Sequence, residues 1–196
     1  MNKENVVEQT KLAFEFIQKL YFEVSYLIKE VEGLLYEEQE RFIIGRPSGY
    51  GINTRSSTGL EPFGVSLWPM RKMAVLFVAE EMTKLSRGQT FTRFTSDPKV
   101  IYLRIVLDEP KLTEPMIYVG VLYNFEGKRF EKAEQVMGQM EYNETRIFTG
   151  SDLIDYEDGY VKFQGRIFTV NLYDINSSED ISTKIIVPVL KIYREL

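Results

Sequence analysis

The sequence predicts an α+β fold in which a long N-terminal amphipathic helix packs on a mainly antiparallel β-sheet, with one further short helix. Two patterns carry this prediction. Apolar residues recur with a helical period over residues 4–44, and several later segments alternate between apolar and polar side chains as strands do. The helix comes first and most strands come later, which favours α+β over an alternating βαβ fold.

The N-terminal helix is predicted from apolar rows that repeat every seven residues and share one broad stripe. The opposite face is charged, and Lys11, Glu15 and Lys19 have the i,i+4 spacing of weak ion pairs. Gly45 and Pro47 are expected to stop the helix, because Gly closes helix ends and Pro cannot continue them. The rows are Ile17, Val24 and Val31; Ala13, Leu20, Leu27 and Leu34; and Phe14, Tyr21, Ile28 and Leu35.

The first strands are predicted between residues 73 and 125. Residues 73–79 are apolar throughout, which fits a strand buried on both faces or a short buried helix, and their Val and Phe content favours the strand. Residues 99–108 alternate cleanly, and residues 116–125 are rich in Tyr, Val and Ile. A Pro-containing turn separates these two segments, so we expect them to form an antiparallel hairpin.

The C-terminal part predicts a short helix and further strands. Residues 129–142 place apolar side chains at helical spacing. Residues 160–163 and 167–173 are expected to form a hairpin around Gln164-Gly165-Arg166. Residues 184–193 are expected to form a last strand, with Pro188 placing it at a sheet edge or a bulge because Pro lacks an amide donor.

These elements fit one globular unit with three segments. They are the helix (1–44), a Gly/Ser-rich loop (45–64) and an α+β domain (65–196). A chain of 196 residues suits a single domain, and a hydrophobic content of 44% supplies a core.

Composition excludes several functions, because the chain has no Cys and no His. Zinc fingers, Cys nucleophiles and Ser-His-Asp triads all need one of these residues. Acid–base chemistry would need a carboxylate, Lys or Tyr with a shifted pKa, and a metal site would be built of oxygen ligands. We therefore expect no cofactor and favour a non-enzymatic protein.

Charge and hydropathy restrict the partners. A net charge of −5 argues against general affinity for nucleic acid. No apolar run reaches the roughly 20 residues of a membrane span, and the polar start lacks the apolar core of a signal peptide. We expect a cytoplasmic protein that binds neither membrane nor nucleic acid.

The loop at 45–64 is the first candidate site. Its Gly-rich backbone and guanidinium groups could hold a phosphate or carboxylate, so an anionic small molecule is one expected partner. The loop lacks the P-loop pattern and follows a helix rather than a strand. A small-ligand or nucleotide sensor is therefore an alternative function, and a plain connector is the competing interpretation. The candidate ligands are Arg46, Ser48, Arg55, Ser56 and Ser57.

A second alternative is a metal-dependent phosphodiesterase or nuclease. Asp108 with Glu126-Gly127-Lys128 is similar to the motif of the magnesium-dependent PD-(D/E)XK nucleases, in which carboxylates hold the metal and Lys stabilises charge at the phosphate. The predicted hairpin opposes this interpretation. It separates Asp108 from Glu126 by roughly 25–30 Å, at about 3.3 Å per residue.

Two further groups have simpler interpretations. The acidic cluster before Gly159 could bind calcium, but its spacing differs from an EF-hand loop, so a solvated turn is favoured. Tyrosines on the expected strands could line a binding face, although core packing is the commoner role of aromatic residues. The acidic residues are Asp152, Asp155, Glu157 and Asp158, and the tyrosines are Tyr118, Tyr123, Tyr160 and Tyr173.

The helix stripe itself is the strongest indication of function. About 30 helical residues span roughly 45 Å, whereas strands usually span about 17–20 Å, so the helix should overhang its domain. A second copy would cover the overhang in a homodimer, with an interface at Ile17, Leu20, Val24, Leu27 and Val31. The competing interpretation is a helix bent near Gly33 and wrapped on its own sheet.

Overall fold

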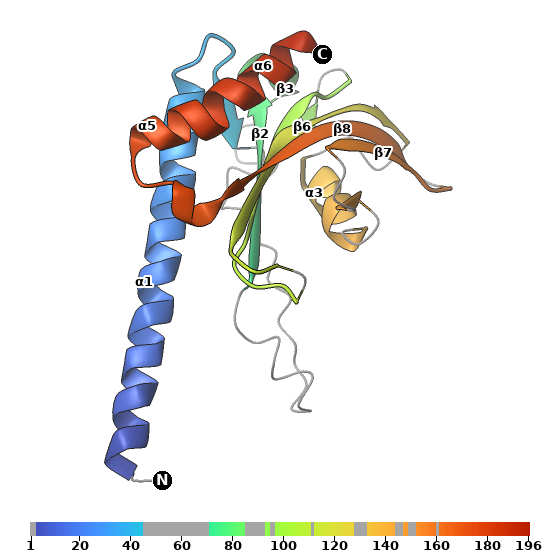
Figure 1. Ribbon diagram of the computed structural model, residues 1–196. Helices are drawn as coiled ribbons and strands as arrows, with labels where there is room; N and C mark the ends of the chain where they lie inside the picture. Colours follow the sequence, from blue (N-terminus) through green and yellow to red (C-terminus); the bar gives the residue numbers. More distant parts are fainter. Residues whose placement is uncertain are drawn as a thin grey trace.

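The computed structural model describes residues 3–44, 71–84, 93–94, 97–110, 112–127, 133–143, 147–148, 152–159 and 161–196. Within them the chain has the expected α+β architecture. Helix α1 (Lys3–Tyr36) precedes a six-stranded sheet, and shorter helices lie between and after the strands (Figure 1).

The large sheet is antiparallel throughout, with the strand order β1-β2-β5-β6-β8-β7. Its strands are β1 (Phe42–Ile44), β2 (Lys72–Ala79), β5 (Val100–Val106), β6 (Met116–Glu126), β7 (Leu153–Glu157) and β8 (Lys162–Asn171). A short second pair joins β3 (Thr83–Lys84) to β4 (Arg93–Phe94). The predicted β5–β6 hairpin is confirmed, with Val106 opposite Met116 and Val100 opposite Leu122.

The central strands are buried on both faces. Alternation along β5 sends Ile101, Leu103 and Ile105 to one core cluster, and Val100 and Tyr102 to another. The first face is covered by α1 and the C-terminal helices, and the second by α3 (Ala133–Tyr142) (Figure 1). The sheet is therefore the middle layer of three.

The N-terminal helix is shorter than predicted. It ends at Tyr36, and residues 42–44 form β1 instead of continuing the helix. Arg41 takes a left-handed conformation (φ 47°), which reverses the chain so that Phe42 can pair with Ala79 on β2. The signals at Gly45 and Pro47 come after this reversal. The helix runs without interruption through Gly33, so no break separates its two halves there.

The predicted hairpin around residues 164–166 is wrong. The segment Gln164-Gly165-Arg166 lies inside the single strand β8. The hairpin that exists pairs β7 with β8, with Glu157 opposite Lys162. Gly165 marks a close approach rather than a turn, because a Cβ there would meet the Leu122 side chain at 2.8 Å.

The predicted last strand is also wrong, because residues 184–193 are helical. Helix α5 (Ser178–Ile181) continues through a π-helical segment (Ser182–Ile186) into α6 (Val187–Glu195). Pro188 stands at the start of α6, directly after the wider π-helical turns, where an N–H is not required. This segment buries Ile185, Val189 and Tyr193 against the same face of the sheet as α1.

Candidate functional site

The N-terminal half of α1 extends beyond the sheet, as expected from the length of the helix (Figure 1). Large apolar side chains on this half are exposed, with Leu12 at 58%, Phe14 at 63% and Phe16 at 66%, and Phe22, just past the middle of the helix, is exposed to 62%. A surface helix usually confines its apolar residues to the side that faces the core. Phe14 and Phe16 are two positions apart and point to nearly opposite sides, so this half is apolar on more than one side.

The predicted interface residues divide into two groups. Val24, Leu27 and Val31 are buried in the chain's own core, together with Leu35. Ile17 and Leu20 are half-buried and lie where the helix leaves the domain. The C-terminal half of α1 therefore holds the helix on the sheet. Surface for a partner is concentrated in the N-terminal half.

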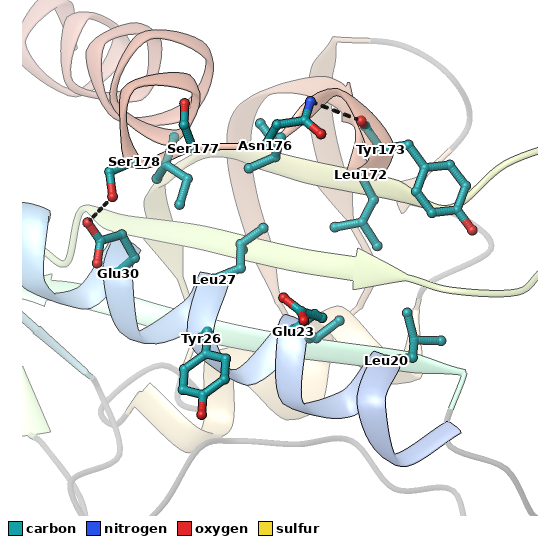
Figure 2. Close-up of a pocket in the computed structure, with 13 residues that line it drawn as sticks. Leu20, Glu23, Tyr26, Leu27, Glu30, Leu172, Tyr173, Asn176, Ser177 and Ser178 are labelled. Atoms are coloured by element: carbon teal, nitrogen blue, oxygen red, sulfur yellow. Dashed lines mark hydrogen bonds between the residues drawn. The ribbon is translucent and has the colours of Figure 1, made fainter. Parts of the chain in front are cut away.

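A groove of about 450 Å³ lies where α1 leaves the sheet. One wall is α1, and the other is the segment that joins β8 to α5 (Figure 2). In Figure 2, Leu20, Glu23 and Leu27 point from α1 toward Leu172. The α1 side consists of Leu20, Glu23, Val24, Tyr26, Leu27 and Glu30, and the opposite side of Leu172, Tyr173, Ile175, Asn176, Ser177, Ser178 and Ile181.

A helix cap fixes the far wall of the groove. The Ser177 side chain accepts a hydrogen bond from the Asp180 amide, and the Asp180 carboxylate accepts bonds from the Asn176 amide and the Ser177 hydroxyl. Lys184 lies 2.6 Å from Asp180 and donates to the Asp174 carbonyl. The hydrogen bond from Lys184, followed by those from Asn176 and Ser177, lowers the pKa of Asp180 to about 2.

A hydrogen bond joins the two walls. The Ser178 hydroxyl donates to the Glu30 carboxylate over 2.7 Å (Figure 2). The groove therefore has an apolar floor of Leu and Ile side chains, with two carboxylates, Glu23 and Glu30, on its α1 wall. Such a lining suits an apolar group that carries a positive charge beside it.

Sequence reasoning missed this groove because its walls are far apart in the chain. The Ser177-x-x-Asp180 spacing is a helix-start signal that could have identified α5. It would still not have placed α5 beside residues 20–30 of α1, since that contact depends on the order of the strands.

The predicted anion-binding residues lie outside the described residues. They are Arg46, Ser48, Arg55, Ser56 and Ser57. The sensor function remains a prediction from sequence.

The geometry disfavours the nuclease-like grouping. Asp108 follows β5 and Glu126 ends β6, at opposite ends of the hairpin, and Lys128 lies outside the described residues. Asp108 lies 3.1 Å from Arg71, and Glu126 lies 4.0 Å from Lys162. Among the described residues, no group of three or more His, Cys, Asp or Glu side chains is placed to hold a metal ion.

The four acidic residues do not form one turn as expected, because most of them lie on or before a strand and only Asp158 lies in the connection that follows it. Asp155 and Glu157 lie on the edge strand β7, and Asp158 accepts hydrogen bonds from the Val161 amide and the Tyr156 hydroxyl. Asp158 thereby closes the β7–β8 connection, as Asp commonly does in turns.

The aromatic residues on the second face of the sheet pack around Arg104. This buried guanidinium lies 4.3 Å from the Phe148 ring centre and 5.8 Å from that of Tyr118. A cavity of about 340 Å³ opens beside Tyr118 and Phe148. Of the other tyrosines considered, Tyr123 is half-buried, Tyr173 is exposed and Tyr160 lies outside the described residues.

Comparison of the chain with protein-family models, curated proteins and solved structures gives no significant match. No helix within the described residues combines the length and the apolar character needed to cross a membrane. The function must therefore be inferred from the exposed half of α1 and the groove beside it.

Proposed function

We propose that this is a non-enzymatic interaction protein that acts as a homodimer through the N-terminal half of α1. The observation that carries the proposal is the exposure of Leu12, Phe14 and Phe16 on the N-terminal half of α1, whereas the other half packs into the core. Single exposed apolar residues are normal on a monomer, but several of this size on one helical segment that leaves the domain are typical of an interaction site.

The mixture of apolar and charged side chains on α1 favours a protein partner. Full burial of a Phe side chain contributes about 1.5–3 kcal/mol, so covering one of these rings would contribute about 1–2 kcal/mol. Charged residues of both signs, including Glu15, Lys19 and Glu23, lie between the apolar residues. A protein surface can pair such charges, and two-fold homodimers are the commonest oligomers.

Sedimentation equilibrium at micromolar concentration tests the proposal. We expect a mass near twice the 22.9 kDa of one chain. In the double variant Phe14→Glu with Phe16→Glu we expect the mass of one chain with an unchanged circular dichroism spectrum, because both side chains are exposed. A single-chain mass for the unmodified protein would refute the homodimer.

The matched control is Val187→Glu. Val187 is an exposed apolar helical residue, at 59%, but it lies on α6 rather than α1. This variant should keep the mass of the unmodified protein. If it dissociated as readily as the α1 variant, the association would be a general effect of exposed apolar side chains and not a property of α1.

A further inference from the structure

We propose that the two copies pair through antiparallel α1 helices, with Leu12 and Phe16 of each copy seated in the groove of the other. The inference rests on the homodimer proposed above and specifies which face of α1 is used and in which direction the helices run. The groove would then be completed by a second copy of this chain.

One face of α1 connects the exposed half of the helix with the groove. Phe16, Leu20, Glu23 and Leu27 are separated by four, three and four positions, and such residues share a side of an α-helix. Leu12 extends this row one turn toward the N-terminus. Phe16 and Leu12 project from the exposed half, whereas Leu20, Glu23 and Leu27 line the groove.

This arrangement makes the surface self-complementary. In an antiparallel two-fold interface residue i of one copy meets residue j of the other and j meets i, so each contact away from the axis is made twice. A two-fold axis on the groove side of α1, at the level of residue 21 along the helix, would bring Phe16 of each copy beside Leu27 of the other and into the groove. Parallel helices would instead place Phe16 against Phe16 and groove against groove, which leaves both grooves unfilled.

Charge supports the same direction. Lys19 and Glu23 lie on this helix face at equal distances along the chain from Tyr21, and both are exposed. Antiparallel pairing about Tyr21 places each Lys19 opposite the Glu23 of the other copy, whereas parallel pairing brings like charges together. The Glu23 carboxylate lines the groove, so it would form an ion pair with the Lys19 ammonium of the second copy beside the apolar lining.

The groove is large enough for Leu12 and Phe16 of a second copy. The groove volume of about 450 Å³ falls in the range of about 300–1,000 Å³ that holds drug-sized molecules, so it can admit a Phe and a Leu side chain. The floor supplied by Leu27, Leu172 and Ile175 is apolar, as an aromatic side chain requires.

Phe14 provides a matched control on the same half of α1. It is exposed to 63%, close to the 66% of Phe16, but it lies about 200° around the helix from Phe16. Pairing through the groove therefore predicts that Phe16→Glu raises the dimer dissociation constant by about 100-fold or more, as loss of a central aromatic anchor does. Phe14→Glu should change it by less than about 5-fold, since peripheral contacts contribute little.

Charge reversal tests the direction of the helices. Lys19→Glu or Glu23→Lys alone should weaken the dimer by about 10-fold or more, because each creates two like-charge contacts. The double variant Lys19→Glu with Glu23→Lys should restore the affinity, since opposite charges again face each other. Circular dichroism should be unchanged in all three variants because both positions are exposed on α1.

The results distinguish this inference from the proposed function. If the protein is dimeric and Phe14→Glu and Phe16→Glu raise the dimer dissociation constant equally, Phe16 does not bind in the groove. The proposal of a homodimer would still stand. Failure of the double charge variant to recover affinity would overturn the antiparallel register. An unmodified protein with a single-chain mass would end both proposals.

Discussion

Arg194 on α6 binds the Glu40 carboxylate through two nitrogens, with both Nε–Oε1 and Nη2–Oε2 distances at 2.9 Å. The same guanidinium lies 2.9 Å from Glu38. These bonds join the C-terminal helix to the turn between α1 and β1. The hydrogen bond from Arg194 is the largest cause of the lowered pKa of Glu40.

Replacing Arg194 should therefore loosen the C-terminal helix. We expect Arg194→Ala to lower the free energy of unfolding by about 1 kcal/mol, a modest value because the pair is partly exposed to solvent. Arg194→Lys should recover only part of this loss, since Lys keeps the charge but cannot make two parallel hydrogen bonds. Urea denaturation measures both values.

Lys191→Ala is the control for this prediction. Lys191 is 75% exposed, and its ion pair with Glu195 is long, at 4.0 Å, so it should contribute little. Its unfolding free energy should stay near that of the unmodified protein. If Lys191→Ala and Arg194→Ala cost the same, the two-nitrogen contact with Glu40 would have no special role.

Asp180 should make stability depend on pH in the acid range. Its pKa falls from 3.8 to about 2 on folding, so the folded state favours the ionised form. This stabilisation is present above pH 3.8 and is lost as the pH falls toward about 2. We expect Asp180→Asn to be less stable than the unmodified protein near neutral pH, with the difference shrinking across this window.

Thermal unfolding followed at several pH values measures this effect. Glu179→Gln is the control, because Glu179 is the exposed neighbour of Asp180 and its side chain does not cap the helix. A difference for Asp180→Asn that stays constant from neutral pH to about pH 2 would contradict the assignment of the effect to the Asp180 carboxylate.

Gly120 lies where the backbones of β6 and β8 leave no room for a side chain. A Cβ at this position would collide with the Arg166 carbonyl oxygen and would lie 2.6 Å from the Ile167 Cα, both of which are backbone atoms. We expect Gly120→Ala to lower the free energy of unfolding by about 3 kcal/mol, because overpacking against backbone cannot be relieved by a side-chain rotation.

Gly165→Ala is the comparison variant. The nearest atom to its Cβ would be Cδ2 of Leu122 at 2.8 Å, the end of a side chain that can move. The cost should be about 1 kcal/mol, measured by the same urea titration. Equal costs at the two positions would mean that β6 and β8 separate easily around Gly120.

The central sheet was predictable because its side chains alternate without interruption. Ile101, Leu103 and Ile105 had to share one face of a strand, and the turn before Met116 required an antiparallel return. The length of α1 was also predictable in outline, since the apolar rows continue through Leu35.

The C-terminal helix was not predictable from residue preference. Ile185, Ile186 and Val189 have the β-branched side chains that favour strands, and Pro188 is unfavourable inside a helix. Burial against the sheet outweighs these preferences, because the helix places Ile185, Val189 and Tyr193 on one side. The helix start at Ser177 and Asp180 is the local signal that agrees with the structure.

The candidate site was predictable only in part. The overhang of α1 follows from its length, but the residues that remain exposed depend on where the sheet ends. The seven-residue rows contain Val24 and Leu27 but not Leu12 or Phe16, so the pattern gave no reason to expect a binding face at these two exposed residues. The groove needs residues 172–181 beside α1, and that contact follows from the packing of α5 on the same face.

The layer that covers one face of the sheet is assembled from both ends of the chain. Val31 and Leu35 of α1 share a single core cluster with Ile185 and Leu190 of the C-terminal segment. During synthesis, α1 and the strands therefore leave the ribosome before the residues that complete this layer. A nascent chain halted before Ser178 would expose the apolar face of β2, β5 and β6 that the C-terminal helices later cover. It would also expose the apolar side chains on the N-terminal half of α1. Such intermediates are the species that chaperones bind. These two apolar surfaces would thus be exposed together until the last helix packs.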